Sequence, residues 1–332
     1  MDVYIDLDNL YSYACKGGSE HFLACNELLR KNFNIHFTFP KEALEQSKKK
    51  VRDSIMTLLK SLTRNRGTRT TDWGSLFPSR PLSDTFYESL TQEQLMSMYW
   101  LSDDQAKAME RQGCLLISSV GNELNTLLQL FIDDESQPSK PYSIRQMTDW
   151  SVIGNNSLPC TDIIVIDPFF FAQSDMLYER NSYKVLEELA CHVNNRPIKI
   201  VIFTNGQNRA ESGGYVDIPI PLIQRQIKER IKDKCGVEPF VTIVKLPTRE
   251  EHDRTIITNY KTFISGDSFK YFDNAGNNTS RGRWLHVNSL AHDSILQQTN
   301  DYLKDLQTLT DSLRTGLMNI IGDKKSNFIN FS

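Results

Sequence analysis

The most informative stretch of the chain is residues 251–268, which read Glu-His-Asp-Arg-Thr-Ile-Ile-Thr-Asn-Tyr-Lys-Thr-Phe-Ile-Ser-Gly-Asp-Ser. As a β-strand, this stretch would place His252 and Arg254 on one face, because side chains alternate between the two faces of a strand. A turn at residues 266–268 closes the segment. An imidazole and a guanidinium side by side are suited to holding a phosphate group.

The composition is that of an ordinary globular protein. Of 332 residues, 39% are hydrophobic and 24% are charged, with a net charge of -3. This length is enough for two domains, and the charge predicts that any contact with nucleic acid is made by a local patch. No apolar run is long enough for a membrane span, and the first residues lack the pattern of a signal peptide. We therefore expect a cytoplasmic protein that makes no membrane contact.

The six cysteines are scattered along the chain, without a Cys-x-x-Cys pair and without a histidine cluster at metal-binding spacing. This pattern predicts free thiols in a reducing compartment and no zinc site. We also expect no cofactor.

The first residues form a short apolar run that leads directly into acidic side chains. Residues 3–5 are a strand candidate, and Asp6, Asp8 and Asn9 follow. The Asp-x-x-Asn sequence resembles the opening of NYN/PIN-like ribonucleases, which implies that Asp6 and Asp8 could hold Mg²⁺. Alternatively, Asp8 or Asn9 caps the next helix. Between residues 20 and 110 the sequence lacks a doubly wound alternation of strands and helices.

A basic region follows in the N-terminal half. It could contact a nucleic-acid backbone, with a tryptophan available for stacking on a base. The alternative is a solvated loop with the tryptophan in the core. The residues concerned are Lys48, Lys49, Lys50, Arg64, Arg66, Arg69 and Trp73.

An acidic, proline-containing segment at residues 133–141 is typical of a linker. We therefore expect a mixed α/β region at residues 1–134, a linker at 135–157, an α/β domain at 158–290, and a C-terminal helix and tail at 291–332. Within the first region, helical patterns predict helices at residues 92–99 and 103–112.

The second half has a clearer pattern. Apolar runs at residues 162–170, 198–203 and 240–246 are typical of strands that are covered on both faces. They alternate with helical patterns at residues 181–193 and 220–235. The stretch at 251–268 supplies a further strand and its partner. This order predicts a compact layered α/β domain.

The same elements carry a family resemblance. One repeat of the phospholipase D superfamily has this order of elements, and its signature is His-x-Lys, four residues, Asp, six residues and a glycine-containing turn. This chain has His252, Arg254, Asn259 and Gly266 at that spacing. Residues 158–290 therefore resemble a phospholipase D-like domain in which Arg and Asn replace Lys and Asp.

The resemblance implies catalytic roles for three residues. His252 would attack phosphorus and form a phosphohistidine, Arg254 would clamp the phosphate, and Asn259 would stand where the family has an acid. An asparagine cannot stabilise a charged imidazolium as a carboxylate does, which weighs against turnover. The chain has a single such motif, so a complete site would require a homodimer.

Other polar residues near this motif are candidates for binding phosphate or for holding a scaffold together. In a non-catalytic domain, a buried His252 and Arg254 would be hydrogen-bonded to Asp167. The predicted phosphate-binding residues are Arg254, Ser268, Arg281 and Arg283.

Our leading hypothesis is a protein that binds nucleic-acid phosphates, with a degenerate phospholipase D-like domain that acts as a nuclease or phosphodiesterase in a dimer. By analogy with similar domains, it would serve bacterial defence. The first alternative is a non-catalytic scaffold or adaptor for a protein partner. The second is a metal-dependent ribonuclease that uses Asp6 and Asp8.

Overall fold

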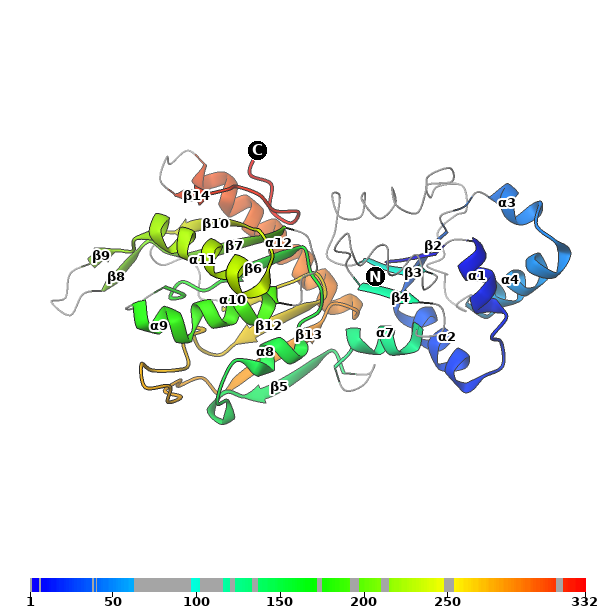
Figure 1. Ribbon diagram of the computed structural model, residues 1–332, viewed down its shortest axis with the longest axis horizontal. Helices are drawn as coiled ribbons and strands as arrows, with labels where there is room; N and C mark the ends of the chain where they lie inside the picture. Colours follow the sequence, from blue (N-terminus) through cyan, green and yellow to red (C-terminus); the bar gives the residue numbers. More distant parts are fainter. Residues whose placement is uncertain are drawn as a thin grey trace. The chain divides into compact units, whose positions relative to one another are not determined.

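The computed structural model describes residues 2–5, 7–37, 39, 41–62, 97–101, 116–119, 123–132, 137–171, 175–191, 197–209, 215–247, 254–314 and 319–332. The chain divides into two compact units (Figure 1). The N-terminal unit comprises Met1–Pro138 with Leu290–Ser294, and the C-terminal unit comprises Ser139–Ser289 with Ile295–Ser332. Both combine helices with a sheet, which confirms the predicted α/β class.

The N-terminal unit contains a four-stranded sheet in the order β2-β1-β3-β4, in which every pairing is parallel. Its strands are β1 (Asp2–Ile5), β2 (Asn34–Phe37), β3 (Ser97–Leu101) and β4 (Leu116–Ser119). Its described helices are α1 (Leu7–Ala14), α2 (Glu20–Asn32), α3 (Lys41–Glu45), α4 (Lys49–Leu62) and α7 (Glu123–Leu130).

This parallel sheet corrects the expectation that residues 20–110 lack an alternation of strands and helices. Helices α1 and α2 connect β1 to β2, and α3 and α4 follow β2. Strand β1 agrees with the strand candidate at residues 3–5, whereas β3, which is only five residues long, was not predicted as a strand. A helix was predicted at residues 92–99, but the described residues from Ser97 onward form β3. Met98 and Trp100 of this strand are buried, and β3 pairs with β1. Pairing with neighbouring strands overrides local propensity here.

The C-terminal unit contains an eight-stranded mixed sheet in the order β14-β10-β7-β6-β11-β12-β13-β5. Its strands are β5 (Ser139–Ser143), β6 (Asp162–Ile166), β7 (Ile198–Asn205), β10 (Pro239–Leu246), β11 (Thr255–Ile257), β12 (Lys261–Ser265), β13 (Trp284–Ser289) and β14 (Ile320–Gly322). A separate hairpin pairs β8 (Gln207–Arg209) with β9 (Tyr215–Asp217).

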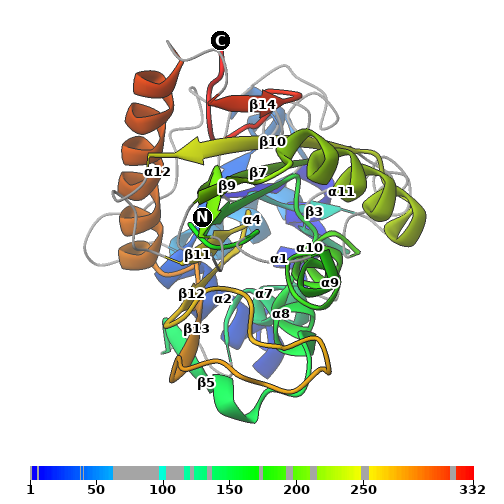
Figure 2. The same cartoon turned by 90° about the vertical axis from the view of Figure 1, so that its left-hand side faces the viewer.

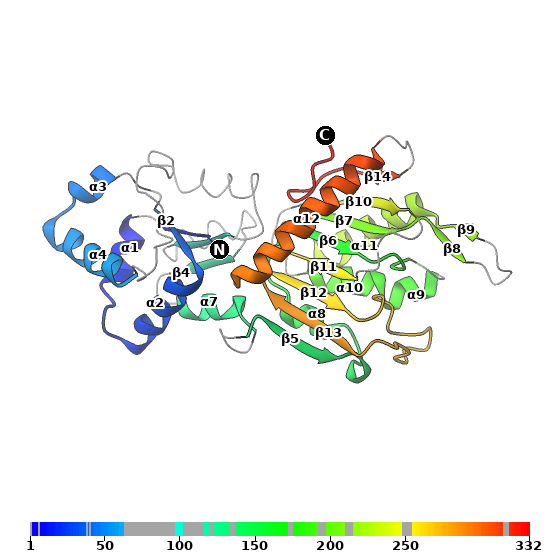
Figure 3. The same ribbon diagram turned by 180° about the vertical axis from the view of Figure 1, so that it is seen from behind.

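Helices cover both faces of this sheet (Figure 2). On one face lie α8 (Ser151–Asn156), α9 (Asp175–Arg180), α10 (Ser182–Ala190) and α11 (Ile220–Cys235). On the other face α12 (Asp293–Leu313) runs across the strands (Figure 3). Because both faces are covered, the central strands are mainly apolar, and every residue of β6 is buried.

Two segments of the C-terminal unit differ from expectation. Residues 139–156, within the predicted linker, instead supply β5 at the sheet edge, the 3-10 helix η1 (Ile144–Gln146) and helix α8. Proline and serine are compatible with an edge strand, so composition alone did not distinguish it from a linker. The last helix ends at Leu313, and the unassigned tail folds back so that β14 pairs with β10.

Cys191 and Cys235 lie at the ends of α10 and α11 and form a disulfide, which corrects the expectation of free thiols for this pair. Among the described cysteines, Cys15, Cys25 and Cys160 do not form disulfides. No described helix combines the length and apolar character needed to cross a membrane.

Candidate phosphate-binding site

The predicted motif residue Arg254 lies beside Asp167, at the carboxyl end of β6. Arg254 immediately precedes β11, which pairs antiparallel with β6 so that Thr255 lies opposite Ile166. Asp167 is completely buried, and burial raises the pKa of its carboxyl group, while the nearby Arg254 charge acts in the opposite direction. Arg254 therefore interacts electrostatically with Asp167. The expected hydrogen-bonded arrangement with His252 stays a prediction, because His252 lies outside the described residues.

The turn that follows β12 closes over the same carboxylate. Asp167 Oδ2 accepts hydrogen bonds from Ser268 Oγ at 2.6 Å and from the Phe269 amide at 2.8 Å. Asp167 Oδ1 accepts from the Phe169 amide at 2.9 Å. Ser268 is 2% exposed. Its hydroxyl is therefore used in tying the turn to β6 and does not face an open phosphate site.

Asn259 lies at the other end of β6. Its Oδ1 accepts hydrogen bonds from the Thr161 amide at 2.8 Å and from the Asp162 amide at 3.3 Å. The β6–β11 register pairs Ile257 with Ile164, so Asn259 continues toward the amino end of β6 while Arg254 lies at its carboxyl end. The two motif residues do not share one site.

The predicted phosphate ligand Arg281 lines an open pocket of about 570 Å³ in the C-terminal unit. Arg145 of η1 lies on the same pocket, although nothing in its sequence neighbourhood singled it out. Two hydroxyl side chains complete the polar lining. The described lining residues are Arg145, Asn278, Thr279, Ser280 and Arg281.

Asn278 and Arg283 hold this loop against η1. Asn278 Nδ2 donates to the carbonyl oxygens of Ile144 and Met147 at 2.7 and 2.9 Å. The Arg283 carbonyl accepts from the Ile144 amide at 3.2 Å, and the Arg283 side chain is exposed. The contacts bring Arg145 and Arg281 together although they are 136 residues apart in sequence (281 - 145).

Asp267 organises the loop from within. Its Oδ2 accepts hydrogen bonds from Ser280 Oγ at 2.8 Å and from the Arg281 amide at 3.0 Å. Partial burial alone would raise the pKa of Asp267, but the hydrogen bonds to Ser280, Arg281, Ser268 and Gly282 hold it below its ordinary value. The carboxylate is thus committed to fixing the loop that carries Arg281.

The remaining predicted sites belong to the N-terminal unit or lie outside the described residues. Lys48, Lys49 and Lys50 are exposed at the start of α4. Asp8 is exposed in the first turn of α1, which already includes Asn9, so neither residue precedes the helix as a cap. The predicted site residues that lie outside the described residues are His252, Asp6, Arg64, Arg66, Arg69 and Trp73.

Within the part of the chain that the structure describes, no group of three or more His, Cys, Asp or Glu side chains is arranged to hold a metal ion.

Comparisons with known proteins show little similarity to this chain. No protein-family model matches the chain, and no curated protein matches it. Among solved structures, the chain is similar to TrmBL2, an archaeal chromatin protein described as showing a novel mode of DNA binding. The match has a TM-score of 0.24 and 11% sequence identity, and it covers 61% of this chain. The chain spans 63% of the length of that protein, which is less than two thirds.

Proposed function

We propose that the C-terminal unit binds nucleic-acid phosphates at the pocket lined by Arg145 and Arg281. The observation that carries this proposal is that the side chains of Arg145 and Arg281 line one open pocket together with Thr279. Guanidinium groups match phosphate oxygens with two parallel hydrogen bonds and stay charged at all relevant pH values. Arg283, two residues after Arg281, is also exposed.

The pocket suits a phosphate within a longer chain better than a free ion. Its volume of about 570 Å³ and its open form leave room for neighbouring groups of a polynucleotide backbone. A chain with a net charge of -3 lacks a general attraction for polyanions, so binding would depend on this local arrangement. Phosphate contacts of this kind position a nucleic acid without reading its sequence.

The test is fluorescence anisotropy with single-stranded RNA and DNA across a salt series. The double variant Arg145→Ala/Arg281→Ala should weaken binding and reduce the slope of log K against log salt by about 0.7 for each lost contact to a single strand. Arg225→Ala is the matched control, because Arg225 is an exposed arginine on α11 with 68% side-chain exposure. Equal weakening by the control would contradict the proposed site.

We further propose that the C-terminal unit, which resembles a phospholipase D-like domain, binds nucleic-acid phosphates without cleaving the phosphodiester bond. Two observations weigh against turnover at the motif: Asn259 is engaged at the far end of β6, and Ser268 is hydrogen-bonded to Asp167. Cleavage of single-stranded substrates should therefore be absent in EDTA, with His252→Ala as the comparison. Metal-free cleavage that disappears in this variant would establish a phosphodiesterase and overturn this view. The homodimer stays a prediction.

A second candidate function is a metal-dependent ribonuclease in the N-terminal unit. The specific observation is the strand order β2-β1-β3-β4, in which the chain leaves β1 on one side and returns to the other with β3. In open parallel sheets, ligands bind beyond the carboxyl ends of the strands at such a switch point. In the sequence, Ile5 of β1 is followed by Asp6, and Leu101 of β3 is followed by Ser102-Asp103-Asp104.

We therefore expect Mg²⁺-dependent cleavage of single-stranded RNA that is lost in Asp6→Ala and in Asp103→Ala. Asp53→Ala is the control, because Asp53 is an exposed acid of α4 in the same unit. Thermal unfolding of each variant separates loss of activity from loss of structure. Cleavage that survives in Asp6→Ala would exclude this function. Absence of both cleavage and nucleic-acid binding would favour the protein adaptor.

A further inference from the structure

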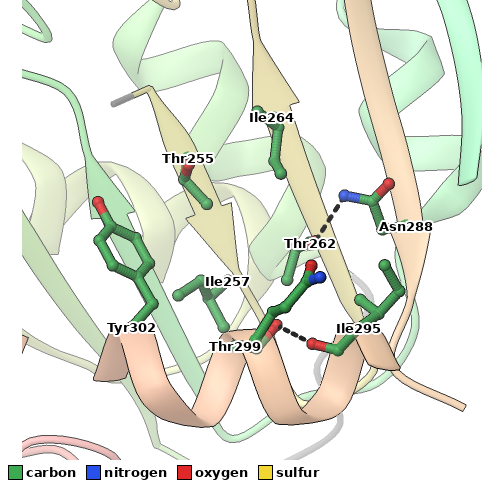
Figure 4. Close-up of a pocket in the computed structure, with 9 residues that line it drawn as sticks. Thr255, Ile257, Thr262, Ile264, Asn288, Ile295, Thr299 and Tyr302 are labelled. Carbon is green, nitrogen blue, oxygen red and sulfur yellow. Dashed lines mark hydrogen bonds between the residues drawn. The ribbon is translucent and has the colours of Figure 1, made fainter. Parts of the chain in front are cut away.

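A second pocket lies in the C-terminal unit between the face of strands β11, β12 and β13 and helix α12 (Figure 4). Its volume is about 220 Å³, which is smaller than the range of about 300–1,000 Å³ usual for drug-sized ligands. The described lining residues are Thr255, Ile257, Thr262, Ile264, Asn288, Ile295, Gln298, Thr299 and Tyr302.

One edge of the pocket is polar and is formed by Asn288 and Thr262, which are hydrogen-bonded to each other. Asn288 and Thr262 are 5% and 3% exposed, and Asn288 Nδ2 donates to Thr262 Oγ1 at 3.0 Å. This bond fixes the amide, so its carbonyl oxygen is presented as an acceptor and the Thr262 hydroxyl as a donor. Thr255 adds a further hydroxyl on the neighbouring strand. Figure 4 shows the amide and the hydroxyl of this pair turned toward each other.

The walls of the pocket are apolar. Ile257 and Ile264 come from the sheet and Ile295 from α12. Ile264 is 44% exposed although it lines the pocket beneath α12. Tyr302 adds an aromatic ring on the side opposite Asn288 (Figure 4). Thr299 does not add a donor, because its hydroxyl donates to the Ile295 carbonyl at 2.8 Å within the helix.

The lining restricts the chemical class of ligand. Its nine described residues include no charged side chain, so a phosphate, a carboxylate or an ammonium ion would lose its hydration without gaining a partner. A monosaccharide presents hydroxyls on most of its edge and would leave several of them against isoleucine. A planar heteroaromatic ring has two apolar faces and one polar edge, which matches apolar walls and a single hydrogen-bonding edge.

We propose that this pocket binds an uncharged nucleobase, either in a nucleoside or in a base turned out of a single strand. Amide side chains such as Asn288 and Gln298 pair with the edges of bases, and isoleucine and tyrosine side chains pack against their faces. Base binding at this pocket would be additional to phosphate binding at Arg145 and Arg281, because the two pockets share no described lining residue.

The test is calorimetric titration of the full chain with adenosine, guanosine, cytidine and uridine, none of which carries a phosphate. At least one nucleoside should bind, and Ile264→Trp should lower its affinity at least about tenfold because the added ring fills the pocket. The Ile264 side chain is already 44% exposed, so this change leaves the core intact. Gln298→Ala should weaken the same nucleoside by several-fold.

Leu222→Trp is the matched control, because Leu222 is a 41% exposed apolar residue on α11. It should bind the nucleoside as the wild type does, and so should Arg145→Ala/Arg281→Ala. The second result separates this pocket from the phosphate site, since either can fail alone. The proposal is overturned if no nucleoside binds, if Ile264→Trp binds normally, or if glucose or ribose binds as tightly as the nucleosides.

Discussion

The two ends of strand β6 carry the same residue in different surroundings. Asp162 at the amino end and Asp167 just beyond the carboxyl end are both completely buried. Burial raises the pKa of both carboxyl groups. At Asp167, both oxygens accept hydrogen bonds from Phe169, Ser268 and Phe269. At Asp162, Oδ1 accepts two hydrogen bonds, but Oδ2 has no hydrogen-bond partner among the described residues.

Asp167 therefore holds the surrounding backbone and Ser268 in place through both of its oxygens, whereas Asp162 does so through one oxygen only. It also explains why the motif residues diverge. Antiparallel pairing of β6 with β11 sends Arg254 to the Asp167 end and Asn259 to the Asp162 end. A five-residue spacing along an extended chain corresponds to roughly 17 Å, so motif spacing alone did not imply a common site.

The largest effect is expected from Asp167→Asn. The amide group would turn its N–H bonds toward at least one of the N–H or O–H donors that now face Asp167. Leaving buried donors unsatisfied is costly, so we expect a loss of about 3 kcal/mol in the free energy of unfolding. Urea denaturation at pH 7 measures it. Ser268→Ala removes only one donor and should cost about 1 kcal/mol; equal losses for the two variants would show that the carboxylate is not the organising group.

Much of the C-terminal unit could be predicted from sequence. The buried strands β6, β7 and β10 are mainly apolar, helix α11 has a regularly spaced apolar face, and Gly236 ends α11 with a φ of 70°. Such patterns are local, and they are therefore visible without knowledge of the partners.

The candidate site was less predictable. Arg281 and Arg283 follow a recognisable turn, but Arg145 joins them only because Asn278 and η1 are hydrogen-bonded across more than 130 residues. Likewise, the short strand β3 is recognised only through its pairing with β1. These features depend on tertiary contacts, which composition and periodicity do not encode.

The second prediction tests whether the family motif can be restored. Asn259→Asp would recreate the family acid but would place a second carboxyl group beside buried Asp162. We expect a loss of about 2 kcal/mol at pH 7, because burial disfavours a new charge. The loss should shrink toward pH 4 as the new carboxyl becomes protonated.

Urea denaturation at pH 4 and pH 7 measures both values, with Asn330→Asp as a control at an exposed position. A stable variant that gains metal-free phosphodiesterase activity would contradict the separation of Arg254 and Asn259.

A smaller effect is expected where the C-terminal tail meets the amino end of β6. Ser326 Oγ donates to Asp162 Oδ1 at 2.9 Å, and the Asn327 amide donates to the same oxygen at 2.6 Å. Ser326→Ala should therefore cost about 1 kcal/mol, since one hydrogen bond is lost and one remains. Ser332→Ala, at an exposed residue, should change stability much less. A loss as large as that of Asp167→Asn would make the two ends equivalent.

The smallest effect at neutral pH is expected from Asp162→Asn, the same substitution that is most harmful at Asp167. The amide oxygen can keep both hydrogen bonds from the tail. The new amide nitrogen takes the place of Oδ2, which already has no hydrogen-bond partner among the described residues, so one unsatisfied group replaces another. Loss of the hydrogen bonds is avoided and a buried ionisable group is removed. We therefore expect a change within about 0.5 kcal/mol at pH 7.

The pH dependence of this variant has a definite sign. Because the pKa of Asp162 is raised in the folded protein, the folded state retains a proton that the unfolded chain loses above about pH 4. The wild type therefore loses stability as the pH rises above that value, and a variant that cannot titrate does not. The stability of Asp162→Asn relative to the wild type should thus increase between pH 4 and pH 7 in urea denaturation. A difference that is constant with pH would mean that Asp162 is ionised in the fold, and that the two ends of β6 are more alike than their hydrogen bonds indicate.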